Sequence, residues 1–235
     1  MATDPDDSAF GQSNGDSRRR RRREHQHDAG EEHMGIGRLE AFTDGVVAIA
    51  ITLLVLDLHV PRLDTINSSD ELLHALRHEW PSFVGFVLSF VTIGVIWANH
   101  HAMFRHIRYA NHWLLMLNLL FLFSVSLLPF STALLAEYLP HSGAERRIAT
   151  VIYAGTFMLM SISFNLLWRY GTHHDGLRDP SSSSASVAAI TRSYTAGFIL
   201  YAIAFVLAWL VPLAGLAMMG GLALLYALPG SGKAR

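Results

Sequence analysis

Six apolar stretches, separated by short polar segments, run through most of the chain. They occupy residues 37–60, 80–102, 109–136, 148–168, 188–211 and 213–228. A helix that rises about 1.5 Å per residue needs roughly 20 apolar residues to cross a hydrocarbon core of about 30 Å. Five stretches reach that length, and the last is at the short end. The pattern predicts an all-α integral membrane protein with a single six-helix transmembrane domain at residues 34–229.

The breaks between these stretches predict how the helices are joined. Pro129 lies inside the third stretch, so we expect a kink or local break near Val125. Pro212 separates the last two stretches, which predicts a tight antiparallel hairpin. Residues 67–70 read Asn-Ser-Ser-Asp, a typical cap for a short amphipathic helix at the outer interface. Residues 171–186 are rich in serine and are expected to form a flexible loop.

The first apolar stretch carries no ionisable side chain from Gly45 to Leu56. At about 100° per residue, three branched side chains fall on one narrow stripe: Ile49, Leu53 and Leu56. Thr52 flanks this stripe, while Val55 is turned well away from it, so a polar residue at Val55 is expected mainly to harm folding. An apolar stripe on a membrane helix usually packs against a neighbouring helix. The stripe alone therefore does not predict a pore.

Composition supports a membrane protein and excludes several other classes. The chain is 51% hydrophobic and only 16% charged, against roughly 25% charged residues in soluble domains. Its formal net charge of −1 gives no reason to expect nucleic acid as a partner. Cysteine is absent, which rules out disulfides, thiol nucleophiles and thiolate metal sites.

The two ends of the chain are polar. Residues 1–33 contain six consecutive arginines and too few apolar residues for a core, so we expect a disordered, Arg-rich cytoplasmic tail. These arginines could attract anionic lipids at about 1 kcal/mol each, although nearby acids would offset part of this. A topology anchor is the favoured interpretation. Residues 230–235 are expected to form a cytoplasmic C-terminal tail.

The distribution of Lys and Arg predicts the orientation. With the N-terminus inside, the cytoplasmic side collects the tail arginines together with Arg105, Arg108, Arg169, Arg178, Arg192, Lys233 and Arg235. The outer side keeps only Arg62, Arg77, Arg146 and Arg147. We therefore expect a multi-pass protein of the cell membrane, embedded in the lipid bilayer with both termini cytoplasmic.

Two short motifs carry a resemblance to a known family. The segment RLEAFTD, from Arg38 to Asp44, resembles the RxxxFSD motif that opens the first helix of the transmembrane protein 175 family. Thr43 stands where that motif has serine and keeps the hydroxyl group. The segment WANHHAMF, from Trp97 to Phe104, resembles the WxxHHxxF end of the family's second helix.

The resemblance implies a fold and an assembly. The family includes lysosomal and prokaryotic potassium channels, and its prokaryotic subunits have six helices and form homotetramers in which the first helix lines a central pore. Mapped by offset from Asp44, the family's hydrophobic constriction falls on Ile49, Leu53 and Leu56, with Thr52 as the nearby hydroxyl.

The resemblance also implies a polar network at the inner end of the first helix. Ionisable side chains at membrane depth are costly and need partners or water. The expected members are Arg38, Phe42, Thr43, Asp44, Trp97, His100 and His101. Separate anchoring of each residue at the interface is the alternative, because long side chains near helix ends commonly reach the headgroups.

These observations predict a potassium-permeable, leak-like cation channel that needs no cofactor. The sequence lacks a TVGYG-type carbonyl filter and an Arg-repeat voltage sensor, so a hydrophobic constriction must set selectivity. The expected partners are K⁺ ions and further copies of the same chain.

Two other functions compete with the channel. A transporter or proton pathway would use Asp44, His100 and His101. A zinc-dependent membrane hydrolase would draw on the histidines around residues 100–112, but no HExxH pattern occurs and no carboxylate stands at ligand spacing. We therefore predict neither an enzyme nor a metal site.

Overall fold

The computed structural model describes residues 34–61, 68–174 and 176–227. These residues form a helical bundle with one two-stranded sheet. The helices are α2 (Ile36–Leu53), α3 (Ser69–His78), α4 (Trp80–Phe104), α5 (His112–Ser126), α6 (Leu128–Tyr138), α7 (Ala144–His173), α8 (Ser184–Leu210) and α9 (Pro212–Ala227), with a 3₁₀ turn, η1 (Leu54–Asp57), after α2. The strands are β1 (Met34–Gly35) and β2 (Tyr109–Ala110). The predicted tails at 1–33 and 230–235 lie outside the described residues.

Five helical segments are long and apolar enough to cross a membrane. They are Ile36–Asp57, Trp80–Phe104, His112–Tyr138, Ala144–His173 and Ser184–Leu210. The prediction of an all-helical, multi-pass membrane protein is thus confirmed. Helix α9 has 16 residues and is shorter than a typical crossing. The sixth crossing therefore stays a prediction.

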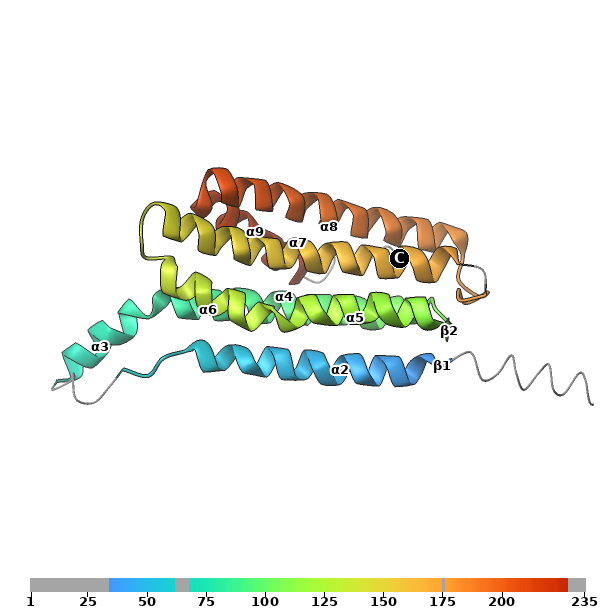
Figure 1. Cartoon of the computed structure of the whole chain (residues 1–235), viewed down its shortest axis with the longest axis horizontal. Helices are drawn as coiled ribbons and strands as arrows, with labels where there is room; N and C mark the ends of the chain where they lie inside the picture. Colours follow the sequence, from blue (N-terminus) through green and yellow to red (C-terminus); the bar gives the residue numbers. More distant parts are fainter. Residues whose placement is uncertain (1–33, 62–67, 175, 228–235) are drawn as a thin grey trace, which may run out of the picture.

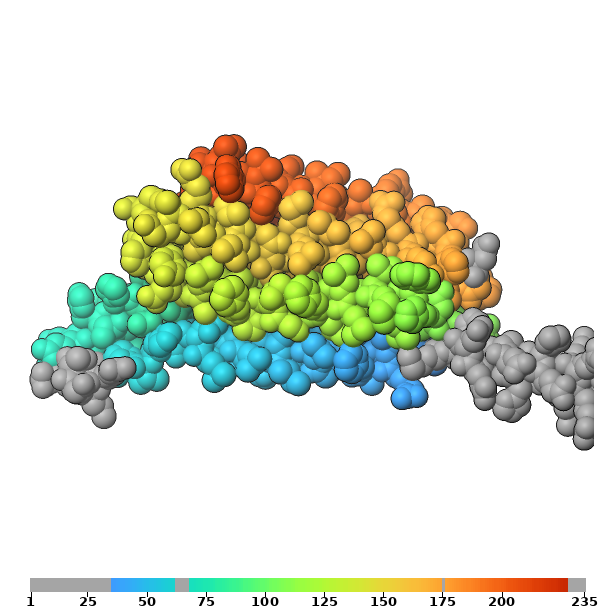
Figure 2. Space-filling view, viewed as in Figure 1, coloured from blue at the N-terminus to red at the C-terminus, as the bar shows by residue number. Residues whose placement is uncertain are grey.

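The helices pack in layers (Figure 1). Helix α7 lies centrally and packs against α5, α6, α8 and α9, burying large side chains such as Tyr153, Phe157 and Trp168. Helices α4 and α5 separate α7 from α2, which lies along one edge of the bundle (Figures 1 and 2). Helix α2 packs mainly against α4 and α5, so one of its faces is left open.

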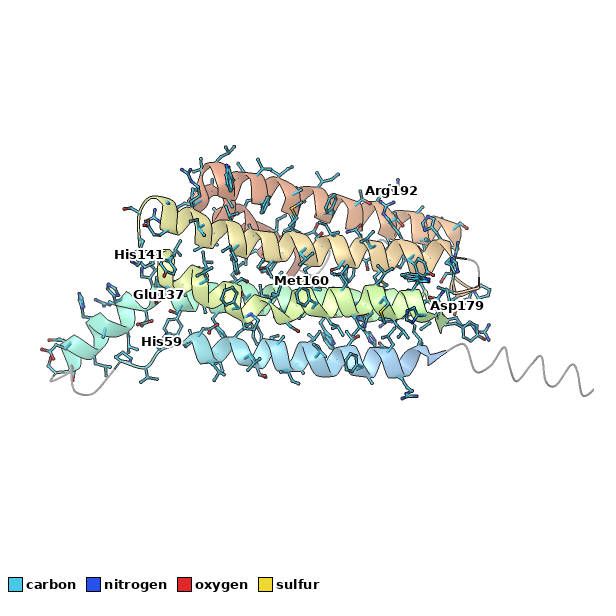
Figure 3. All side chains as sticks on the ribbon, in the orientation of Figure 1. His59, Glu137, His141, Met160, Asp179 and Arg192 are labelled. Carbon is cyan, nitrogen blue, oxygen red and sulfur yellow. The ribbon has the colours of Figure 1, made fainter. Side chains whose placement is uncertain are left out.

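The bundle has two distinct ends. His59 and His141 lie at one end with Glu137, whereas Asp179 and Arg192 lie at the other (Figure 3). We call the second the Arg-rich end, because most of the described arginines of the loops and helix termini gather there. Helix α3 projects from the opposite end (Figure 1).

The breaks between helices follow the sequence signals closely. Helices α5 and α6 meet at Leu127. The break predicted near Val125 is thus confirmed, and it lies two residues further along the chain. Pro129 lies in the first turn of α6, where its missing N–H costs no helical hydrogen bond. The predicted cap of α3 is Ser68, whose side chain accepts a hydrogen bond from the Glu71 N–H at 3.2 Å.

The loop predicted at residues 171–186 is too long, because both neighbouring helices extend into that range. Helix α7 continues to His173, and α8 begins at Ser184 with Ser183 as its cap. The shorter connection is held by the α4–α5 loop: the Arg108 N–H donates to the Leu177 carbonyl at 2.7 Å. Tertiary backbone pairing, which composition does not reveal, fixes this segment.

Candidate functional site

One buried amide joins α2 to two other helices at the Arg-rich end. The Asn118 side chain of α5 donates through Nδ2 to Thr43 Oγ1 of α2 at 2.9 Å. Its Oδ1 lies 3.0 Å from Nε2 of His100 on α4 and, with the amide in this orientation, accepts the ring N–H. All three side chains are fully buried. The network therefore positions α2 against both neighbours at once.

Aromatic rings enclose His100. Its imidazole stacks on Phe121 with ring centroids 5.2 Å apart, and the Phe104 ring meets it edge-on at 4.5 Å. The second ring nitrogen, Nδ1, is buried and has no hydrogen-bond partner among the described residues. His100 is thus a packed hydrogen-bond donor with no contact to solvent.

Two further polar pairs join α2 to α4. The Trp97 Nε1–H donates to Asp44 Oδ1 at 2.8 Å, and His101 Nδ1 lies 2.5 Å from the Glu40 carboxylate. The pairs are four residues apart on each helix, which is one turn, so both fit the same antiparallel register. Trp97 and His101 are exposed and their rings stack.

The structure thus brings together five of the seven residues expected in the polar network: Thr43, Asp44, Trp97, His100 and His101. It leaves Arg38 and Phe42 exposed on α2. No ion pair joins Arg38 to Asp44 within the described part of the chain, where the Asp44 carboxylate accepts from Trp97 instead.

Sequence reasoning missed two members of this network. Asn118 carried a usable signal, because it is a lone amide within the apolar run LLMLNLLFLF, and intramembrane polar groups usually have a partner. Glu40 occupies a variable position of the first motif, so the motif gave no reason to single it out.

The apolar stripe of α2 lies on the open face of the subunit. Ile49 is 61% exposed, Leu53 42% and Leu56 71%. Thr52 is also exposed, and its hydroxyl donates to the Ile49 carbonyl at 2.9 Å. The opposite face buries Leu39, Thr43, Val47 and Ala50. The stripe is therefore available for contact with other copies, ions or lipid.

The structure does not bury Val55 inside the subunit, so the folding defect expected of a polar residue there stays a prediction. Val55 is 50% exposed, and its neighbour Leu54 is fully buried instead. The buried positions Thr43, Val47, Ala50 and Leu54 keep the helical spacing of three or four residues, and Val55 lies about 100° beyond Leu54, on the flank between the buried face and the stripe.

The histidines near the Arg-rich end have separate surroundings. His100 and His101 contact Asn118 and Glu40, whereas His106 bonds to Ser182 Oγ at 2.8 Å. Within the described ranges, no group of three or more His, Cys, Asp or Glu side chains is placed to hold a metal ion.

The segment before α2 is tied to this end of the bundle. Strands β1 and β2 pair antiparallel, with Met34 opposite Ala110 and Gly35 opposite Tyr109. The same α4–α5 loop forms a bridge from Ile107 to Arg178 in the α7–α8 connection. The position where the chain enters α2 is thus connected to the α4–α5 loop and, through that loop, to the α7–α8 connection.

Comparison with known proteins places these features in a family. The family described as "Endosomal/lysosomal potassium channel TMEM175" matches residues 38–129. A potassium channel from Chamaesiphon minutus is 43% identical over 174 residues, which cover 74% of this chain and 84% of the relative. A protein from Gallus gallus named as an endosomal/lysosomal proton channel, TMEM175, is 34% identical over 143 residues, 59% of this chain and 28% of the relative.

The fold agrees with these relatives. A crystal structure of a TMEM175 homolog from Chamaesiphon minutus, described as a lysosomal potassium-selective channel, matches with a TM-score of 0.72 at 40% identity. The match covers 81% of this chain and 95% of that one. With the two motifs joined in one network at the start of α2, the chain belongs to the TMEM175 family of ion channels.

Proposed function

We propose that the chain forms a homotetrameric, potassium-permeable, leak-like channel in which four α2 helices line a central pore. The proposed constriction is formed by Ile49, Leu53 and Leu56, with Thr52 beside it. One observation carries the proposal: α2 presents this branched apolar stripe outward, while buried hydrogen bonds hold its other face. Such an arrangement is what a helix facing a symmetry axis requires.

Assembly around an axis gives the stripe a partner. Closed cyclic symmetry is the ordinary form of homo-oligomers, and it would bring the open faces of α2 together at one axis. Rings of branched side chains would strip water from a passing ion, and the penalty is smaller for weakly hydrated K⁺ than for Na⁺. Slow conduction with modest selectivity follows from such a hydrophobic constriction.

Bi-ionic reversal potentials in planar bilayers test the constriction. Ile49→Asn and Leu53→Asn should each raise the current and move the K⁺/Na⁺ reversal potential toward zero, because a polar ring lowers the dehydration barrier. Ile199→Asn is the matched control, since Ile199 is an equally apolar, exposed side chain on α8. Unchanged reversal potentials in both stripe variants would place the pore elsewhere.

We further propose that the Arg-rich end is cytoplasmic and that the channel resides in the cell membrane. The distribution of basic residues supports this orientation. Because the chain has no cysteine, a single engineered cysteine at His141 or Arg192 reports its side unambiguously. A membrane-impermeant thiol reagent added outside intact cells should label the first and spare the second.

A transporter or proton pathway through the Asp44, His100 and His101 cluster is the second candidate. The name of the Gallus gallus relative supports it, as does the grouping of Glu40, Asp44 and His101. The buried Nδ1 of His100 argues against a relay through that ring, since a proton there has no acceptor among the described residues. Liposome flux separates the candidates: a channel passes K⁺ without a counter-substrate, whereas a transporter requires strict coupling.

A further inference from the structure

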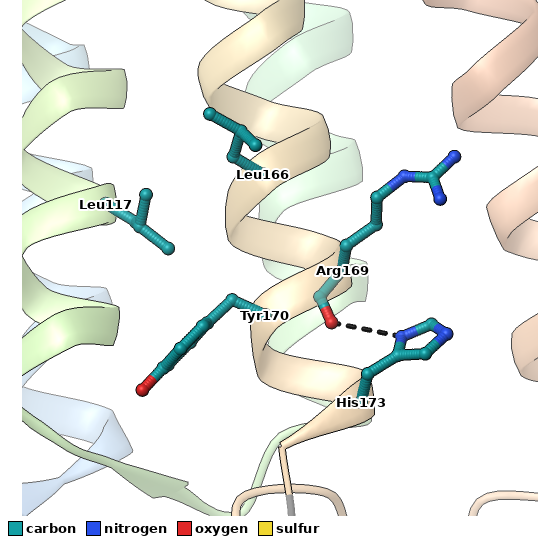
Figure 4. Close-up of a pocket in the computed structure, with 5 residues that line it drawn as sticks. All are labelled: Leu117, Leu166, Arg169, Tyr170 and His173. Carbon is teal, nitrogen blue, oxygen red and sulfur yellow. Dashed lines mark hydrogen bonds between the residues drawn. The ribbon is translucent and has the colours of Figure 1, made fainter.

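A groove on the outside of the bundle lies apart from the α2 network. It has a volume of about 350 Å³ and opens between α5 and α7 near the Arg-rich end. Its lining residues are Leu117 of α5 and Leu166, Arg169, Tyr170 and His173 of α7 (Figure 4). No part of the proposed conduction path uses these residues.

The groove changes from apolar to cationic along α7. Leu166 lies toward the middle of the helix, Arg169 almost one turn further on, and His173 is the last helical residue. At about 1.5 Å per residue the step from Leu166 to His173 covers roughly 10 Å. Each headgroup region of a bilayer is about 5 to 8 Å deep, so such a span can reach from the acyl chains to the headgroups. The groove therefore matches an amphipathic ligand lying along the membrane normal.

Two side chains of the groove keep free hydrogen-bond donors, and their polar ends point to opposite sides of α7 (Figure 4). The Arg169 guanidinium donates one Nη2 bond to Thr195 Oγ1 at 2.9 Å, and no carboxylate pairs with it in the described part of the chain. The Tyr170 hydroxyl accepts from Asn111 Nδ2 at 2.9 Å, so its own proton remains available. The guanidinium of arginine suits phosphate oxygens, because it can donate two parallel hydrogen bonds to them.

His173 adds to the polar end of the groove. Its Nδ1 bonds to the Arg169 backbone carbonyl at 3.0 Å, and the ring extends to the same side of α7 as the guanidinium (Figure 4). This places the imidazole and the guanidinium on one turn of α7, on the same side of the groove.

We propose that this groove binds an acidic phospholipid of the leaflet at the Arg-rich end. The phosphate contacts Arg169, and an acyl chain lies along Leu166 and Leu117. The apolar half favours a lipid over free phosphate, because phosphate alone gains nothing from Leu166. Charge complementarity favours an acidic headgroup over a zwitterionic one.

Native mass spectrometry of the purified full chain, with phosphatidylglycerol or phosphatidylcholine added to the micelles, tests the proposal. Wild-type protein should retain more phosphatidylglycerol. Arg169→Gln should lower that retention about fivefold, the factor that corresponds to one basic residue near an anionic lipid, and leave phosphatidylcholine unchanged. Arg169→Lys keeps the charge and should retain part of the binding.

Arg192→Gln is the matched control, because Arg192 is an exposed arginine on α8 at the same end but outside the groove. Equal retention of the two lipids, or an equal loss of phosphatidylglycerol in Arg169→Gln and Arg192→Gln, would overturn the proposal. A third outcome would also overturn the proposal: Arg169→Gln changes the number of subunits in the assembly but leaves lipid retention unaltered. The groove would then be a contact between copies of the chain. Lipid retention is measured without any ion conduction. The lipid proposal can therefore fail or succeed independently of the proposed channel function.

Discussion

Asn118 satisfies polar groups on two other helices with one side chain. Its amide donates to Thr43 and accepts from His100, and all three groups are cut off from water. An unsatisfied buried polar group costs about 1 to 3 kcal/mol, although hydrogen bonds between membrane helices average nearer 0.6 kcal/mol. The amide therefore contributes more by fixing the position of α2 than by raw stability.

Asn118→Leu should lower stability by about 1 to 2 kcal/mol, because it leaves both Thr43 and His100 without their partner. Thermal unfolding of the detergent-purified protein measures this. Ser126→Ala on the same helix is the control, since the exposed Ser126 bonds only to the Leu122 carbonyl of its own helix. An equally small effect of both substitutions would mean that α2 is held by apolar packing alone.

At the scale of elements, the α4–α5 and α7–α8 loops are joined through His106. Its ring bonds to Ser182, and its carbonyl accepts from the Asp179 N–H at 2.9 Å. Burial lowers the pKa of His106, the nearby Arg105 and Arg178 lower it further, and Asp179 opposes them. Hydrogen bonds from Ser181 lower the pKa of Asp179, which favours the charged form of that carboxylate.

The loop contact should weaken in mild acid. Because the folded state has the lower His106 pKa, it binds fewer protons than the unfolded state, and its stability falls as the pH drops below about 6.5. Hydrogen exchange of the Asp179 amide, corrected for intrinsic rates, should be faster at pH 5.5 than at pH 7.5. His106→Gln should remove this dependence. The Val211 amide at the α8–α9 connection is the internal control, and the same acceleration there would indicate global loosening instead.

Helix α9 packs closely against α8 at Gly215. A Cβ added at Gly215 would lie 2.5 Å from the Ala208 backbone nitrogen, a clash that no rotamer change relieves. Gly215→Ala should therefore separate α8 from α9 and cost about 1 to 3 kcal/mol, measured as a lower midpoint of thermal unfolding. Gly220→Ala, which meets nothing within 4 Å, should be neutral or slightly stabilising. Equal behaviour of the two variants would mean that α9 is not packed closely at that turn.

At the scale of the whole molecule, assembly should depend on the bundle and not on the N-terminal tail. Residues 1–33 have too few apolar residues to join a core. Deleting them should leave both the proposed tetramer, measured by light scattering, and K⁺ flux in liposomes nearly unchanged. Loss of flux in a well-folded, tetrameric truncation would assign the tail a direct part in conduction.

Much of the fold was predictable, because its signals are local. The length of an apolar run fixes which segments can cross a bilayer, and Ser68 and Pro129 act on the turns beside them. The site was predictable only in part. The two motifs indicated α2 and α4, but Asn118 on α5 and Glu40 within the first motif emerged as members only from their contacts.

The sequence by itself determined the helical class, the five long crossings, the break at Leu127 and the apolar stripe of α2, since each depends on residues close in the chain. Tertiary structure decided which face of α2 stays open, that Val55 is exposed, that Asp44 bonds to Trp97 rather than Arg38, and that the α7–α8 connection is held. Each of these depends on the register between helices or loops remote in sequence. Spacing along one helix does not encode that register.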